Sequence, residues 1–73
     1  MGESIHSKEY KAIIQKLIAA RMGSGLTQVE AGLKLKKPQS YISKIERRER
    51  RIDVVELQKL LKVYKQSLKN FFS

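Results

Sequence analysis

Polar side chains recur at helical spacing between residues 39 and 47. The set comprises Gln39, Ser40, Ser43 and Lys44. With ~100° between successive residues, these positions share one side of a helix, and Ile42 and Ile45 fall on the other. The major groove of duplex DNA admits such a helix, with its polar side chains against the base edges. The stretch therefore predicts a helix that contacts DNA bases.

Two of these side chains have the geometry for direct base recognition. Gln39 can pair bidentately with adenine and Lys44 suits guanine, each pair discriminating by ~1–3 kcal/mol. Ser40 and Ser43 are short and accept several bases, so we expect them to add little specificity. Tyr41 lies at the edge of the helix, where either its hydroxyl reaches a phosphate or its ring is half-buried in the core.

A basic connector follows this helix, with arginines that include Arg47, Arg50 and Arg51. We expect these side chains to contact phosphates, which adds affinity and salt dependence but little sequence preference. The alternative is a solvated charged surface.

The charge of the whole chain favours a polyanionic partner. Its 73 residues carry 16 Lys and Arg against seven Asp and Glu, a net charge of +9. Such a field attracts polyanions, with double-stranded DNA the first candidate and an anionic membrane surface the second. A membrane partner is disfavoured because no predicted helix pairs an all-basic face with a bulky apolar one. No segment approaches the ~18 apolar residues needed to span a bilayer.

Catalysis and metal binding have little support in the sequence. The chain has no cysteine, and His6 is its single histidine. Metal sites need several converging ligands, and a phosphate-binding glycine loop would have to follow a strand. We therefore expect no enzyme activity, no metal, no cofactor and no small-molecule ligand. The lack of cysteines and of a signal-peptide pattern in residues 1–7 favours a cytoplasmic, nucleoid-associated protein.

Short helices are predicted to position these residues. Apolar spacing predicts a first helix over residues 10–22, with Ser7 as its cap and Gly23-Ser24-Gly25 at its end. Thr27 and Glu30 form a capping box that starts a second helix.

The third helix, residues 39–46, starts after Pro38, whose fixed φ suits a helix start. Asp53 and Glu56 form the capping box of a fourth helix, and Ser67 caps a last turn. The expected core stripe of the fourth helix comprises Val54, Leu57, Leu60, Leu61 and Tyr64.

No strand pattern and no repeat is present. The sequence therefore predicts an all-α, compact five-helix bundle with a helix-turn-helix at about 27–46. We expect a flexible N-terminal segment over residues 1–8 and one domain over residues 9–73.

Arg21 interrupts the apolar stripe of the first helix. A charge there must be paired or must extend to solvent. Glu46, on the inner flank of the third helix, is the expected partner, and the alternative is an Arg21 exposed at the helix end. The ion pair would tie the first helix to the helix that contacts DNA.

These residues resemble the helix-turn-helix family of the Cro and lambdoid repressors, also called the xenobiotic-response-element (XRE) type. The resemblance is carried by Arg21, Gly25-Leu26-Thr27-Gln28, Pro38 to Arg47 and Arg50 to Leu57. It implies a five-helix domain that binds operators as a dimer, with a buried pair at Arg21 and Glu46. It also implies a phosphate contact for Gln28. The base contacts that it implies fall on Gln39, Ser40 and Lys44, with Ser43 beside them, and the backbone contacts on Arg47, Arg50 and Arg51.

The chain departs from the family pattern at its turns. The usual glycines after the second and third helices are Lys36 and Arg48. Lys36 must accept left-handed geometry, at a cost of ~1 kcal/mol, or use another turn. The usual Leu-Ala pair is Ala31-Gly32, which leaves a smaller core contact and a weaker helix.

Apolar side chains remain for a partner. Val29 and Leu33 point away from the inner face of the second helix, and Phe71 and Phe72 cannot both easily turn inward. We expect a homodimer formed through the C-terminal turn, since two DNA half-sites require a two-fold dimer.

The predicted function is a sequence-specific transcriptional regulator, in this family most often a repressor, on a palindromic operator. The alternatives are a restriction–modification controller, an antitoxin-like regulator, or a protein–protein module of the transcription machinery.

Overall fold

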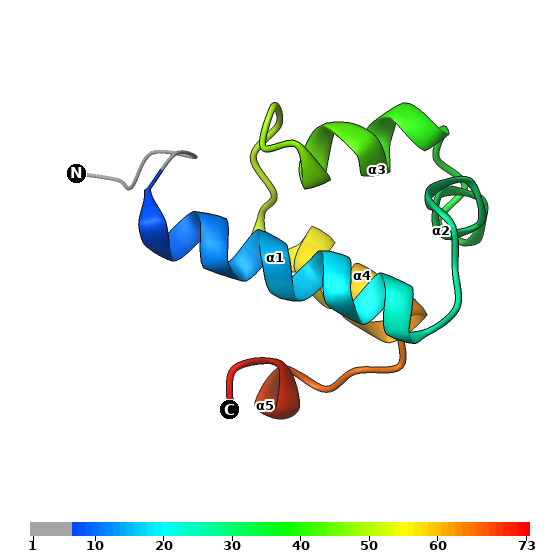
Figure 1. Ribbon diagram of the computed structural model, residues 1–73. Helices are drawn as coiled ribbons and strands as arrows, with labels where there is room; N and C mark the ends of the chain where they lie inside the picture. The colour runs from blue at the N-terminus through cyan, green and yellow to red at the C-terminus, as the bar shows by residue number, and fades with distance from the viewer. Residues whose placement is uncertain (1–6) are drawn as a thin grey trace.

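The computed structural model describes residues 7–73, and its regular structure is entirely helical (Figure 1). The helices are α1 (Lys8–Gly23), α2 (Gln28–Lys34), α3 (Gln39–Glu46), α4 (Val54–Val63) and α5 (Leu68–Phe71). The predicted all-α five-helix fold is confirmed. The predicted flexible segment over residues 1–8, with His6, lies outside the described residues apart from Ser7 and Lys8.

Side-chain caps start the helices at the predicted residues. The caps are Ser7 for α1, Thr27 with Glu30 for α2, Asp53 with Glu56 for α4 and Ser67 for α5. At α2 and α4 both halves of the capping box form, so two backbone N–H groups at each helix start are satisfied. α3 has no side-chain cap and starts after Pro38, whose φ is −71°.

The first four helices share one kind of ending. The residue two positions beyond each helix has a left-handed backbone: Gly25 (φ 80°), Lys36 (57°), Arg48 (60°) and Lys65 (59°). The next residue then donates its backbone N–H to the carbonyl five residues earlier, as Lys37 does to Gly32 at 2.9 Å. This is the Schellman arrangement, in which glycine is the favoured left-handed residue. The left-handed alternative for Lys36 is confirmed, and Arg48 and Lys65 adopt the same geometry.

The helices pack around a small apolar core. In Figure 1, α3 lies above α1, α2 is seen end-on at the right, and α5 lies below the other helices. The core comprises Ile14, Leu17, Ala31, Ile42, Ile45, Leu57, Leu60, Leu61, Tyr64 and Phe71. The predicted place of Val54 in this core is wrong, because its side chain is 65% exposed. Val54 is the first residue of α4. The helical period predicts the direction in which its side chain points but not whether another helix lies there to pack against it.

Gly32 is a poor helix former, but it is needed in α2 because no side chain fits at this position. A Cβ at this position would lie 2.7 Å from the carbonyl oxygen of Lys37 and 3.2 Å from that of Pro38. Glycine therefore lets the turn between α2 and α3 approach the α2 backbone closely. The same glycine weakens the helix itself, and it allows the close packing of α3 against α2.

Candidate nucleic-acid interface

A buried ion pair joins the end of α1 to the end of α3. Arg21 Nε donates to Glu46 Oε2 at 2.7 Å and Arg21 Nη2 donates to Glu46 Oε1 at 3.1 Å. The two side chains are only 13% and 7% exposed. The hydrogen bonds to Glu46 raise the pKa of Arg21 above its already high ordinary value. The predicted Arg21–Glu46 pair is confirmed, and Arg21 also donates to the carbonyl of Leu26 at 2.9 Å.

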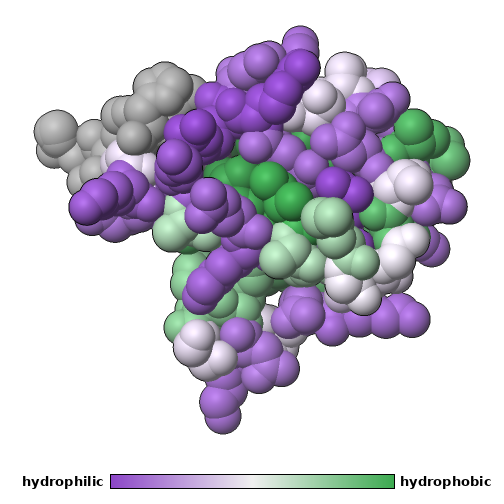
Figure 2. Space-filling view, viewed as in Figure 1, coloured by the Kyte–Doolittle hydropathy of each residue, from purple (hydrophilic) through white to green (hydrophobic). Residues whose placement is uncertain are grey.

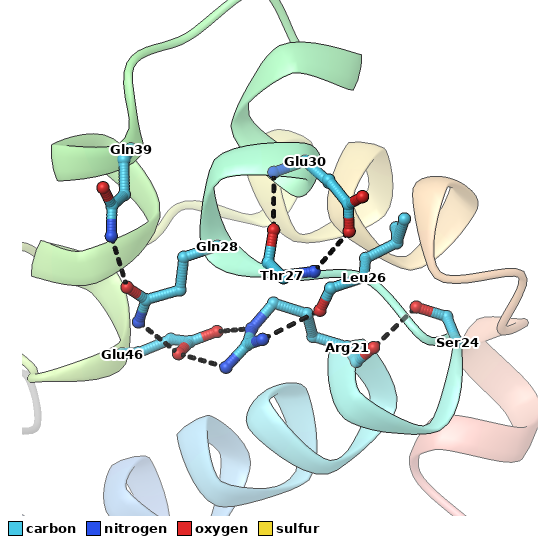
Figure 3. A network of polar contacts seen from close by, with 8 residues as sticks. All are labelled: Arg21, Ser24, Leu26, Thr27, Gln28, Glu30, Gln39 and Glu46. Carbon is cyan, nitrogen blue, oxygen red and sulfur yellow. Dashed lines mark hydrogen bonds and ion pairs between the residues drawn. The ribbon is translucent and has the colours of Figure 1, made fainter.

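The ion pair continues into a chain of amides that ends at the start of α3 (Figure 3). Gln28 Nε2 donates to Glu46 Oε1 at 2.9 Å, and Gln39 Nε2 donates to Gln28 Oε1 at 3.2 Å. A relay of four side chains therefore connects Arg21 in α1 to the exposed first residue of α3. The relay was not predicted from the sequence, where Gln28 was expected only to contact a phosphate.

Each amide in this relay has one allowed orientation. The Glu46 carboxylate accepts hydrogen bonds and cannot donate them. Gln28 must therefore turn its NH₂ group to Glu46, which leaves its oxygen toward Gln39. Gln39 must in turn present its own NH₂ group to that oxygen. One N–H and the oxygen of the Gln39 amide remain available outside the protein.

The outer side of α3 carries the residues that were predicted to contact bases. Gln39, Ser40 and Lys44 are exposed, whereas Ser43 is half-buried. The inner side carries Ile42 and Ile45, whose side chains are buried. The helix is thus divided into a core face and a polar outer face, as its spacing predicted.

Tyr41 belongs to a cluster of polar and charged side chains between α3 and the start of α4, separate from the relay. Its ring is half-buried, and its hydroxyl donates to Glu56 Oε2 at 3.1 Å. Arg50 donates two hydrogen bonds to the same carboxylate, at 3.0 and 2.7 Å, and its guanidinium lies 4.9 Å from the centre of the Tyr41 ring. Lys37 places its ammonium 5.3 Å from that ring centre.

The cluster shifts the pKa values of three groups, and the hydrogen bond to Glu56 raises that of Arg50. The hydrogen bonds from Arg50 outweigh partial burial and lower the pKa of Glu56 to about 2. Burial, together with the hydrogen bond to Glu56, raises the pKa of Tyr41 to about 12. At neutral pH Glu56 is therefore ionised and Tyr41 keeps its proton. Glu56 was predicted from the sequence only as part of a capping box, although its second carboxylate oxygen can accept hydrogen bonds from other donors.

The connector arginines have partners within the protein. Arg47 pairs with Glu49 at 3.3 Å in an exposed ion pair, and Arg50 is held by Glu56. The guanidinium of Arg51 lies 5.8 Å from the ring centre of Tyr10. Each of the three guanidinium groups therefore has a contact within the protein.

The two neighbouring phenylalanines of the C-terminal turn differ in burial. Phe71 is 5% exposed and belongs to the core, whereas Phe72 is 53% exposed. Their rings meet edge to face, with centres 5.0 Å apart. Lys16 in α1 donates to the carbonyl of Phe71 at 2.9 Å, which ties the turn to α1. The expectation that the two rings cannot both turn inward is confirmed.

Apolar side chains are also exposed on α2. Val29 and Leu33 are 47% and 70% exposed, as predicted from their direction on the helix. Figure 2 shows an apolar area at the right-hand edge of the mostly polar face, over α2.

Residues 7–73 contain no group of three or more His, Cys, Asp or Glu side chains that would hold a metal ion. Within the same residues, no helix has the length and apolar character needed to cross a bilayer.

Comparison with known proteins identifies the family. A family model described as helix-turn-helix matches residues 17–71, which include the C-terminal part of α1 from residue 17 and all of α2 to α5. No curated protein matches the chain. The matched region contains the Arg21–Glu46 pair, the capped α2 and the polar face of α3. The chain therefore belongs to the helix-turn-helix family of the Cro and XRE type, a family of DNA-binding transcription regulators.

Proposed function

We propose that this DNA-binding regulator is a sequence-specific repressor that occupies a palindromic operator as a homodimer. The observation that carries the sequence-specific part of the proposal is the Gln39 amide, which a hydrogen bond of 3.2 Å to Gln28 orients. Its position at the exposed start of α3, and its single allowed orientation through Gln28 and Glu46, prepare it for one kind of base.

The free groups of Gln39 match adenine. Adenine presents an N6 amino donor and an N7 acceptor in the major groove, and the amide offers its oxygen and one N–H to them. Because the relay holds the amide, little side-chain entropy is lost on binding. Lys44 is the proposed guanine contact, and Ser40 and Ser43 complete the base-contacting set.

Phosphate contacts are proposed for Gln28, Tyr41, Arg47, Arg50 and Arg51. For Arg50 and Tyr41 a phosphate must share or replace Glu56 as the partner. This exchange lowers the net gain from each contact, since a carboxylate is already bound. Their role is to set the position of α3 on the duplex while the α3 side chains select the bases.

The proposed dimer contact is the C-terminal turn. Phe72 exposes about half of its surface, and Phe71 supports its ring from the core. Burying the exposed part of two Phe72 rings, ~100 Å² each at ~25 cal/mol per Å², gives ~5 kcal/mol before the costs of association. Light scattering at micromolar protein should give a dimer mass that is lost in Phe72→Ala. A monomer with and without DNA would reject the dimer.

The experiment for the function is selection of binding sites from a random duplex library at ~150 mM salt, where purely electrostatic binding is weak. We expect a palindrome whose half-sites are about one helical turn apart. Gln39→Ala should remove the preference for adenine at one position of each half-site. Gln15→Ala, which removes an exposed glutamine from α1, is the matched control and should keep it.

The same selection separates the alternatives. Enrichment of no motif would reject the operator function and favour a protein–protein module. If a motif is found, transcription from a promoter that carries it distinguishes repression from activation.

A further inference from the structure

A basic groove lies between the C-terminal end of α2 and the outer side of α4. Its volume is about 450 Å³, and its lining comprises Lys34, Leu35, Lys59, Lys62 and Val63. Leu35 and Val63 are half-buried and pack against the core, so they form an apolar floor. The three lysines are exposed around it. A smaller hollow of about 110 Å³ shares Leu35 and Lys59 and is also lined by Lys37, Tyr41 and Glu56.

The lysines of this groove have no anionic partner within residues 7–73. The ion pairs of these residues involve Arg21, Arg47 and Arg50, and no carboxylate lines the larger groove. Lys34 and Lys62 each lie in the last turn of a helix, where carbonyl groups partly offset their charge. Lys59 and Lys62 are three residues apart on one helix face, where like charges repel. An anion in the groove would relieve this repulsion.

The protein has few carboxylates to offer to the groove of another copy. Within residues 7–73, Glu30, Glu46, Asp53 and Glu56 serve in capping boxes or buried contacts and Glu49 pairs with Arg47, whereas Glu9 is exposed in the first turn of α1. Two copies that each carry +9 also repel one another. The occupant with complementary charge is therefore a different molecule.

An acidic protein segment matches the groove better than the DNA backbone does. None of the residues proposed to contact DNA lines the larger groove. A sugar-phosphate backbone also carries no bulky apolar side chain to cover Leu35 and Val63. We propose that the groove docks an acidic segment of another protein that inserts an apolar side chain between carboxylates. The partner surface is then separate from the base-contacting face, and the proposal does not depend on operator binding.

The test is fluorescence anisotropy at ~150 mM salt, where long-range attraction is screened. The probe is a short labelled peptide of glutamate and leucine, compared with a peptide in which serine replaces every leucine. The groove variant combines Lys59→Gln with Lys62→Gln. The control combines Lys8→Gln with Lys11→Gln, which removes the same charge from exposed positions of α1. Thermal unfolding checks that both variants fold.

The leucine peptide should bind the wild-type protein and the control equally. It should bind the groove variant about three- to tenfold more weakly, as expected for the loss of two surface ion pairs. The serine peptide should bind the wild-type protein more weakly than the leucine peptide.

Four results would overturn the proposal. The first is that the leucine peptide does not bind the wild-type protein. The second is an equal loss of peptide affinity in the groove variant and the control, which would show that binding depends only on the total charge. The third is equal binding of the two peptides, which excludes the apolar floor. The fourth is a larger loss of affinity for random duplex DNA in the groove variant than in the control, which would make the groove a phosphate contact.

Discussion

Replacement of Gly32 by alanine should destabilise the protein, although alanine is the better helix former. In an open helix interior the change would stabilise by ~1 kcal/mol. Here the new Cβ would lie 2.7 Å from the Lys37 carbonyl oxygen and 3.2 Å from that of Pro38. Both obstacles are backbone, and Lys37 is held by its own hydrogen bond to the Gly32 carbonyl at 2.9 Å. The turn before α3 must therefore move as a unit.

The magnitude follows from these two opposing effects. Overpacking costs ~1–3 kcal/mol, and the 2.7 Å approach to a backbone oxygen places this site in the upper part of that range, at ~2–3 kcal/mol. After the ~1 kcal/mol gain in helix propensity, the net destabilisation is ~1–2 kcal/mol. For a domain of this size that lowers Tm by roughly 4–16 °C. The assay is thermal and urea unfolding followed by circular dichroism.

Gly23→Ala is the matched control for Gly32→Ala. Gly23 is the last residue of α1, and a Cβ there meets nothing within 4 Å. This change should leave the stability unchanged or raise it by up to ~1 kcal/mol. A Gly32→Ala protein as stable as the wild type would refute the reasoning, because the α2–α3 turn would then yield without cost.

Three other substitutions, one of them with a matched control, test the contacts and the backbone conformation described above. Arg21→Ala should destabilise by ~3–5 kcal/mol, because it leaves the Glu46 carboxylate buried without its cation; an unchanged Tm would contradict the structural role of the pair. Lys65→Gly should stabilise the protein by ~1 kcal/mol, since it relieves a left-handed non-glycine backbone. Lys62→Gly inside α4 should instead destabilise it by a similar amount. If urea unfolding shows that both substitutions change the stability in the same direction, the backbone strain at Lys65 is refuted. The pKa of Glu56 is lowered from 4.5 to about 2 by its guanidinium partner. The stability it contributes is therefore fully present above pH 4.5 and lost as the pH falls through about 2. Tm measured over that pH range should fall less steeply in Glu56→Gln than in the wild type, and parallel curves would exclude Glu56 as a source of the acid sensitivity.

Local rules predicted most of the secondary structure. The capping boxes at Thr27 and Asp53 act within one turn of helix, so their residue types and spacing suffice to place the starts of α2 and α4. The inner and outer faces of α3 follow from the helical period. The Arg21–Glu46 pair was also predictable, because a charge inside an apolar stripe requires a partner and few acidic residues faced inward.

The C-terminal ends were harder to predict. Lys36 and Arg48 stand where the family has glycine, so a left-handed backbone was one of two alternatives at Lys36. The left-handed backbone of Lys65 was not predicted, although Lys65 occupies the same position after α4. The Schellman hydrogen bonds and the packing of each following segment hold these residues left-handed against their local preference.

The sequence by itself determined where the helices start, which face of each helix is apolar, and that Arg21 must either pair with an acidic residue or extend to solvent. The tertiary structure alone decided the partners of side chains that have several choices. Gln28 could have faced solvent, yet the approach of α2 to α3 places it between Glu46 and Gln39. The physical reason is that a helical period sets the direction of a side chain about its own axis. The neighbour that it meets depends on how helices distant in sequence pack together, as the exposed Val54 also shows.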